Sequence, residues 1–157
     1  FISGNNKKIV NSSVLETLEK EKEFGLLKLS VWKNFADRVY EHRNKLTYLL
    51  KKLKKKGKKI HIYGASGKGQ SLMQFNKIDN KIIDYVYDKS KFKQNKYTPG
   101  THIKIIDPKK INVIKPDYLL LLSWNLVKEI MKQEKKYLKN NGKIIIPFPE
   151  PRLVNKY

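Results

Sequence analysis

Cysteine is absent from the sequence and histidine is scarce, and both facts limit the chemistry that the chain can carry out. Without cysteine there are no disulfides and no thiolate ligands for zinc or an iron–sulfur cluster. The imidazole groups that remain are His42, His61 and His102. We therefore expect no metal site within these residues.

Long hydrophobic runs are also lacking. The apolar runs are all too short to span a bilayer, as at residues 60–63, 82–87, 118–122 and 144–146. The N-terminus has no charged start followed by a long apolar stretch and a small-residue cleavage site. A length of 157 residues matches one domain. We expect a soluble, cytoplasmic protein with one principal domain.

Arginine is rare, although the chain is strongly basic. Lys and Arg together number 35 against 14 Asp and Glu, a net charge of +21, yet the arginines are only Arg38, Arg43 and Arg152. Such a charge can attract a polyanion. Guanidinium, however, is the group preferred for bidentate contacts to phosphate and guanine. We favour solvated surface lysines, and a basic nucleic-acid-binding protein remains an alternative.

The first part of the chain predicts two helices. Residues 1–30 are expected to form a connecting segment with a short charged helix that ends near Gly25. A longer helix is expected over residues 31–56, where apolar side chains recur at intervals of three and four and lysines precede a stop at Gly57. We expect its apolar stripe to pack against the sheet or another helix. The stripe consists of Trp32, Phe35, Val39, His42, Leu46, Leu49 and Leu53.

After Gly57 the pattern changes to short apolar runs that alternate with helical segments. Continuous apolar strands separated by helices predict a parallel sheet that is covered on both faces. The fold class is therefore α/β, a Rossmann-like domain over residues 31–157 that includes the long helix 31–56. Strands are expected at 59–63, 82–87, 102–106, 118–122 and 143–146, and further helices at 68–76 and 125–138.

In such a sheet, ligands bind at the carboxyl ends of the strands. The first candidate is the turn Gly64, Ala65, Ser66, Gly67 and Lys68, which lies between a strand and a helix. Its glycines permit close backbone approach, and the helix N-terminus offers N–H groups to an anion. The spacing GxxGxG differs from GxGxxG and from a P-loop, so ATP hydrolysis is disfavoured. The alternative is a structural turn without a ligand.

Three further groups follow later strands. Asp88 lies 24 positions after Gly64, where dinucleotide-binding folds often place a carboxylate for ribose hydroxyls, although a solvated aspartate is the alternative. Two other groups are expected to contact sugar, phosphate or base. The alternative for the first group is a turn without a ligand, and the alternative for the second is helix packing with an Asn cap. The first group is Pro99, Gly100, Thr101 and His102, and the second is Trp124, Asn125 and Glu129. No acid/base set is apparent, so no catalytic residue is assigned.

Taken together, the segments resemble the C-terminal domain of S-adenosylmethionine-dependent sugar C-methyltransferases, which act on nucleotide-linked deoxy-keto-sugars. Matching blocks in family order carry the resemblance across nearly the whole chain. These blocks are residues 62–69, 84–93, 97–103, 116–125 with 129–130, and 147–151, and the similarity extends upstream through 35–39. One departure is Ser66-Gly67, where small alanine-like residues are usual.

The resemblance implies a dTDP-sugar-like ligand and a methyltransferase catalytic domain as partner, in cis or in trans. In that family a zinc domain and a domain that binds S-adenosylmethionine supply the cofactors and catalytic groups. No residue of this chain matches those groups, so we predict that these residues alone are inactive. A stand-alone Rossmann-like nucleotide- or NAD-binding module is the alternative function.

Overall fold

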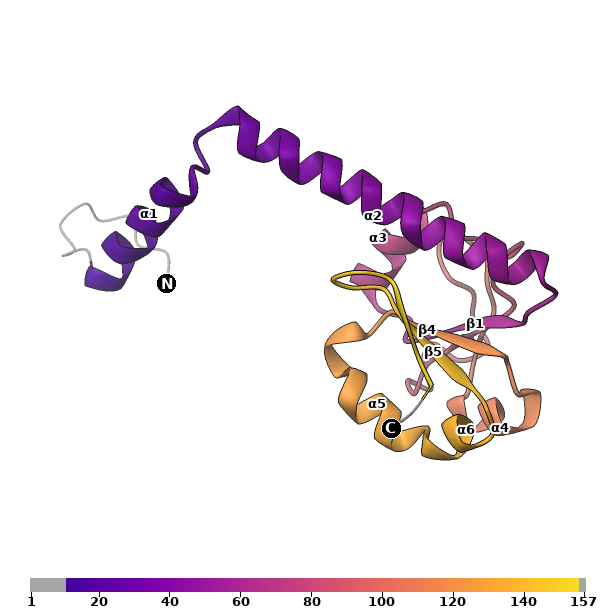
Figure 1. Cartoon of the computed structure of the whole chain (residues 1–157). Coiled ribbons are helices and arrows are strands. Elements are labelled where there is room, and N and C mark those ends of the chain that lie inside the picture. The colour runs from indigo at the N-terminus through magenta and orange to yellow at the C-terminus, as the bar shows by residue number, and fades with distance from the viewer. Residues whose placement is uncertain (1–10, 156–157) are drawn as a thin grey trace. The chain divides into compact units, whose positions relative to one another are not determined.

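The computed structural model describes residues 11–155 (Figure 1). The chain divides into two compact units, one up to Tyr40 and one from Glu41 onward. Each unit is described by itself. Helix α2 (Leu29–Lys55) belongs to both, because the division falls within it.

The first unit contains α1 (Ser12–Phe24) and the beginning of α2. The side chain of Asn11 accepts a hydrogen bond from the Ser13 N–H and begins α1. Gly25, with φ 79°, ends it in the left-handed conformation, which confirms the predicted stop. None of the described residues of α1 is buried, so tertiary packing does not account for this helix.

The expected apolar stripe of α2 is only partly correct. Leu46 and Leu53 are buried, and so is Leu50, which the stripe left out. Trp32 and Phe35 are about half exposed, at 50% and 51%, so the prediction that they are buried against the sheet or another helix was wrong. Spacing identifies one face of a helix but does not tell how far along its length that face is covered.

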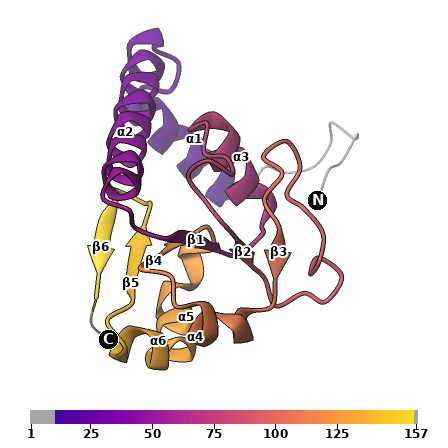
Figure 2. The same cartoon turned by 90° about the vertical axis from the view of Figure 1, so that its right-hand side faces the viewer.

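The second unit is built on a six-stranded sheet in the order β3-β2-β1-β4-β5-β6 (Figure 2). Strands β1 to β5 run parallel, as predicted, whereas β6 pairs antiparallel with β5. The β5–β6 connection is too short for the crossover that a parallel pair requires. The strands are β1 (Ile60–Tyr63), β2 (Val86–Tyr87), β3 (Ile105–Ile106), β4 (Tyr118–Leu121), β5 (Lys143–Ile146) and β6 (Arg152–Val154).

Helices cover both faces of this sheet. Alternate strand residues pack in two separate apolar clusters, one with Leu46 and Leu50 of α2 and Met73 of α3, the other with Ile130 and Tyr137. The helices are α3 (Gly67–Phe75), α4 (Ile111–Ile114), α5 (Val127–Gln133) and α6 (Lys135–Lys139), with 3₁₀ turns η1 (Pro108–Lys110) and η2 (Trp124–Leu126). The α/β architecture is therefore as expected.

Two predicted strands are shorter than expected, and one predicted helix is divided. Ile82 and Ile83 are buried within a turn, with both N–H groups donating to the Asp79 carbonyl, so β2 starts only at Val86. His102 has φ 52° and lies in a turn before β3. The helix predicted over 125–138 is broken at Glu134 between α5 and α6. An apolar run indicates that its residues are buried, and residues in a turn can be buried as well as residues in a strand.

Residues 11–155 contain neither a membrane-spanning helix nor a cluster of metal-ligating side chains. None of the helices in this range has the length and apolar character needed to cross a bilayer. Nor does the same range bring three or more His, Asp or Glu side chains together as a possible metal site.

Candidate functional site

The candidate site lies where the strand order reverses. β1 and β4 are neighbours in the sheet. The chain continues from β1 to β2 on one side of this pair and from β4 to β5 on the other side, so the two connections run in opposite directions. Such a switch point forms a crevice at the carboxyl ends of the strands. A cavity of about 190 Å³ occupies this position. It is lined by Tyr63, Gly64, Asp88, Lys89, Ser123, Leu126, Glu129, Ile130 and Gln133.

Glycine is required at one position in the turn between β1 and α3 and at another in the first turn of α3. Gly64 has φ 97°, and a Cβ there would overlap the side chain of Ser123. At Gly69 a Cβ would lie 2.6 Å from Leu122 Cβ and 2.9 Å from Ser66 Oγ. At Gly67 a Cβ would meet nothing within 4 Å. Gly64 and Gly69 thus allow α3 to pack against β4, and Gly67 leaves open space beside the helix N-terminus.

Ser66 begins α3. Its Oγ accepts a hydrogen bond from the Gly69 N–H at 3.1 Å and lies 3.4 Å from the Leu122 carbonyl, to which it donates. Because α3 starts at Gly67, the N–H groups of Gly67 and Lys68 have no carbonyl acceptor within the helix. Together with the helix dipole, these N–H groups favour an anion at this position.

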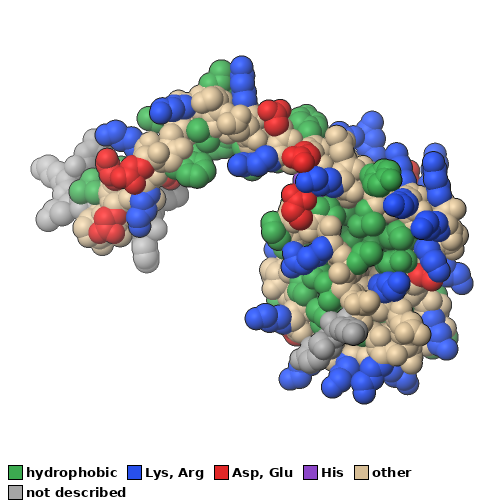
Figure 3. Space-filling view, viewed as in Figure 1, with side chains coloured by type: hydrophobic (Ala, Val, Ile, Leu, Met, Phe, Trp, Pro, Cys, Tyr) green, Lys and Arg blue, Asp and Glu red, His purple; other side chains and the backbone are tan. Residues whose placement is uncertain are grey.

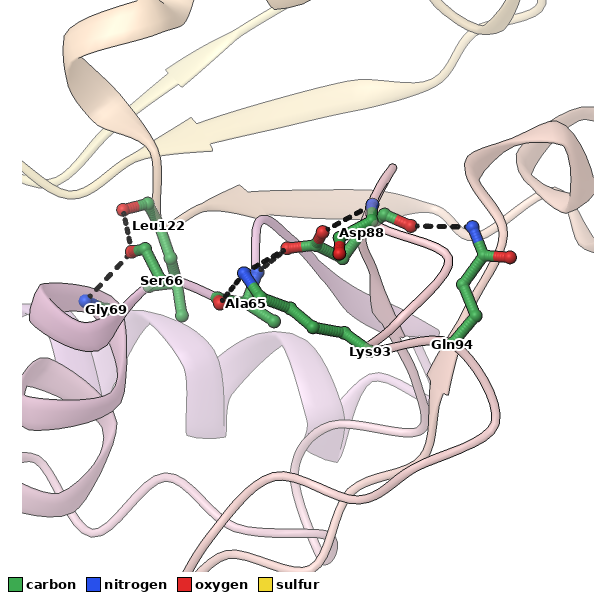
Figure 4. A network of polar contacts seen from close by, with 8 residues as sticks. Ala65, Ser66, Gly69, Asp88, Lys93, Gln94 and Leu122 are labelled. Atoms are coloured by element: carbon green, nitrogen blue, oxygen red, sulfur yellow. Dashed lines mark hydrogen bonds and ion pairs between the residues drawn. The ribbon is translucent and has the colours of Figure 1, made fainter.

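Asp88 fastens the β1–α3 turn to the segment that follows β2 (Figure 4). One carboxylate oxygen accepts from the Ala65 N–H at 2.8 Å, and the other accepts from the Ser90 N–H at 2.8 Å. Lys93 Nζ donates to the Ala65 carbonyl at 2.8 Å and lies 3.4 Å from the carboxylate. The Asp88 side chain is only 13% exposed. Its main observable role is therefore to hold the loop.

A second cavity, of about 280 Å³, opens beside the same turn. Four of the predicted residues line it, namely Ala65, Ser66, Gly67 and Pro99. The remaining lining residues are Gln70, Lys93, Lys96, Tyr97, Thr98 and Ile105. The two lysines and the N-terminus of α3 make this cavity suitable for an anion.

The segment Pro99–His102 enters this site only through Pro99. Thr101 is buried, and its hydroxyl lies 2.7 Å from that of Thr98, which in turn accepts from the Ile103 N–H. His102 is exposed, and its ring stacks on Tyr97 with centroids 4.4 Å apart. The Thr101 hydroxyl is thus engaged in fixing the turn.

Trp124 makes a cation–π contact with Lys68 and belongs to a series of three aromatic rings in contact. Lys68 Nζ lies 5.2 Å from the Trp124 ring centroid, a cation–π distance. Trp124 contacts Phe148 at 4.8 Å, and Phe148 stacks on His42 at 4.4 Å. His42 Nε2 lies 2.6 Å from the Pro147 carbonyl, so this ring has the structural role expected from its place in the stripe.

Asn125 and Glu129 lie in different environments. Asn125 is exposed within η2, and α5 begins at Val127 without a side-chain cap, so the expected helix cap at Asn125 was wrong. Glu129 lines the first cavity and accepts a hydrogen bond from Gln133 Nε2 at 2.6 Å. Its carboxylate is 58% exposed and can accept further hydrogen bonds.

The first cavity is lined by two carboxylates, Asp88 and Glu129, and by the Lys89 ammonium group. Burial, together with the nearby Glu134 carboxylate, raises the pKa of Tyr63. Burial also raises the pKa of Glu134, against the opposing effect of Lys89. Asp88 and Glu129 add to the negative field around Tyr63. This cavity therefore suits hydroxyl donors, whereas the second cavity suits phosphate.

Several lining residues were missed in the sequence. Ser123 lies two residues after the end of β4, so its position near a strand end was a usable signal. Lys93 and Lys96 gave no such signal, because they reach the second cavity from a segment that is distant in sequence from the β1–α3 turn.

Comparison with known proteins places this geometry in a family context. Residues 2–149 match the family model described as the C-methyltransferase C-terminal domain. The chain is similar to C-methyltransferase NovU of Streptomyces niveus, with 35% identity over 146 residues. The match covers 93% of this chain and 35% of NovU, so the chain spans about a third of the length of this curated relative.

Proposed function

The chain belongs to the family of C-methyltransferase C-terminal domains, and from this premise we propose that it binds the nucleotide-sugar substrate of a sugar C-methyltransferase. In this proposal the sheet is a Rossmann-like scaffold, and the ligand is a dTDP-sugar-like molecule of deoxysugar biosynthesis. The methyl group comes from S-adenosylmethionine, which, like zinc, binds to a part of the enzyme outside these residues. A methyltransferase catalytic domain, in cis or in trans, is the partner, and the cytoplasm is the expected location.

One observation carries the proposal. Two cavities of different character flank the β1–α3 turn at the switch point, one with the acidic side chains Asp88 and Glu129, the other with Lys93 and Lys96. A nucleotide-sugar combines hydroxyl-rich rings with a diphosphate. It therefore needs both kinds of environment close together.

The residues divide the work as follows. The N–H groups of Gly67 and Lys68 and the Lys68 ammonium receive the diphosphate, because they offer positive charge without an acceptor in the helix. Glu129 accepts a hydrogen bond from a sugar or ribose hydroxyl. Trp124, which already holds a cation against its face, supplies a stacking surface. Asp88 acts mainly by holding Ala65 in place.

The proposal is tested by titrating the chain with a dTDP-sugar and with NAD. We expect dTDP-sugar binding, and Lys68→Ala should weaken it by about 1.5 to 3 kcal/mol, the range for a charge-assisted contact. Gly67→Val should block approach to the helix N-terminus without harm to the fold, since a Cβ there meets no atom within 4 Å. Lys132→Ala, an exposed change on α5, is the matched control and should leave binding unaltered.

The outcomes separate the alternatives. Tighter binding of NAD than of the dTDP-sugar would favour a stand-alone dinucleotide-binding module. Equal dTDP-sugar affinity in wild type, Gly67→Val and Lys68→Ala would show that the β1–α3 turn is only structural. Far-UV circular dichroism of each variant confirms that the fold is retained. Asp88→Ala is not a clean binding test, because it releases the loop.

A further inference from the structure

A group of lysines converges near the start of β1 and β2, at the opposite end of these strands from the candidate site. A cavity of about 480 Å³ is lined by five lysines together with Asp79 and Ile82. Lys51, Lys54 and Lys55 come from the end of α2, which leads into the start of β1, while Lys77 and Lys81 precede β2. We propose that this cavity, here called the basic corner, binds small anions that carry several phosphate groups.

The charge of the basic corner is largely unbalanced. Lys54 Nζ pairs with an Asp84 carboxylate oxygen at 3.1 Å. Within residues 11–155, no ion pair is formed by the other four lysines of the corner. Asp79 is the one acidic residue among those that line the cavity, and an oxygen of its side chain accepts from the Lys81 N–H at 3.0 Å. Ammonium groups held around one cavity repel each other, and a multivalent anion would relieve that repulsion.

A helix end alone does not explain this arrangement. Cations near the C-terminus of α2 are favoured by the helix dipole, which accounts for Lys54 and Lys55. Lys77 and Lys81 belong to a separate segment, and Lys77 has φ 52°, a conformation uncommon outside glycine. The fully buried Ile78 and the nearly buried Ile82 anchor that segment. The fold itself therefore directs these two lysines toward the helix end.

The shape and composition of the basic corner indicate the class of ligand. Lys and Arg side chains gather over the C-terminal end of α2 in the space-filling view (Figure 3). A neighbouring cavity of about 400 Å³ shares Lys54 and adds Lys58 and Lys59. No arginine or aromatic residue lines the basic corner, so base reading and base stacking have no support there. Lysine ammonium groups bind phosphate as point charges.

Isothermal titration with inorganic tripolyphosphate tests the proposal, with ATP and orthophosphate titrated in parallel. We expect tripolyphosphate to bind more tightly than orthophosphate, with an affinity that falls as salt rises. The triple variant Lys51→Gln/Lys55→Gln/Lys81→Gln should raise its Kd about tenfold or more, because it removes three ammonium groups. The control triple Lys132→Gln/Lys136→Gln/Lys139→Gln removes the same charge from exposed positions of α5 and α6. It should change the Kd less than about threefold.

Further comparisons identify the source of the phosphates and separate this cavity from the candidate site. ATP binding equal to that of tripolyphosphate assigns recognition to the phosphates alone, and tighter ATP binding assigns a nucleotide as the source. The loss in the corner variant should persist in a Lys68→Ala background, in which phosphate binding at the candidate site is weakened, and the corner variant should leave dTDP-sugar binding unchanged. Equal losses in the two triple variants, or no tripolyphosphate binding at low salt, would overturn the proposal. Tighter binding of a single-stranded oligonucleotide, lost in the corner variant, would overturn the assignment to small anions.

Discussion

His61 is an ionisable side chain that the sheet buries almost completely, at 1% exposure. Its Nδ1 lies 2.9 Å from the Tyr87 hydroxyl, and its Nε2 lies 3.6 Å from an Asp84 carboxylate oxygen. Burial lowers the pKa of His61 to about 4, and Lys54 and Lys59 act in the same direction. The attraction of Asp84 for an imidazolium offsets this only in part. His61 is thus neutral in the folded protein near neutral pH.

This burial predicts a loss of stability in mild acid. The folded pKa of about 4 lies below the ordinary value of 6.5, so between these values the unfolded chain binds more protons at His61. The contribution of His61 is complete above pH 6.5 and is lost as the pH falls toward 4. Urea unfolding at pH 7 and pH 4.5 should differ by on the order of 2 kcal/mol from this residue. His61→Gln cannot titrate, and an unchanged pH dependence in that variant would refute the assignment.

At the candidate site, the sequence indicated which residues follow strands but not which groups their side chains bind. The Gly64–Lys68 turn and Asp88 follow β1 and β2, as the sequence predicted, and Gly64, Asp88 and Glu129 line the first cavity. Their contact with a ligand stays a prediction. What Asp88 binds depends on the Ala65 N–H, 23 residues away, and such a contact leaves no local pattern. The burial of the Thr101 hydroxyl beneath the turn is likewise set by tertiary packing.

At the scale of elements, α2 gives a test of which half of the helix stabilises the fold. Leu50 is fully buried among the apolar residues under α2, whereas Phe35 is 51% exposed. Leu50→Ala should lower the free energy of unfolding by about 2 to 5 kcal/mol, as expected when a buried leucine leaves a cavity. Phe35→Ala, the matched change on the same helix, should cost about 0.5 kcal/mol or less. Both values come from urea denaturation, and a large loss in Phe35→Ala would show that its ring is covered.

The elements themselves were predictable where one physical signal dominated. The glycines at 25 and 57 ended helices as expected, because each takes a positive φ that other residues avoid. Apolar runs flanked by turns marked β1, β4 and β5 closely. The same signal overextended β2, since Ile82 and Ile83 are buried from a turn. Strand β6 was missed because Arg152–Val154 is short and its strand character comes from pairing with β5.

At the scale of the whole molecule, the net charge does not by itself indicate where a ligand binds. The net charge of +21 is spread over many exposed lysines, so it does not mark one binding face by itself. The structure distinguishes a few positions within this background, namely Lys68 and Lys93 beside the candidate site and the five lysines of the basic corner. Lysine composition was uninformative because it does not tell which ammonium groups the fold brings together.

A substrate-binding domain of the proposed kind should have no methyltransferase activity by itself. Incubated with S-adenosylmethionine and a dTDP-keto-sugar, these 157 residues alone should form no methylated product while still binding the sugar nucleotide. The physical reason is that the candidate site offers hydrogen-bond donors, acceptors and positive charge but no assigned acid/base pair to form a carbanion. Transfer of a labelled methyl group, measured by mass spectrometry, is the assay. A full-length sugar C-methyltransferase with its own catalytic domain, assayed on its own substrate, serves as the positive control. Methylated product from the chain alone would contradict the prediction and would require a donor site within these residues.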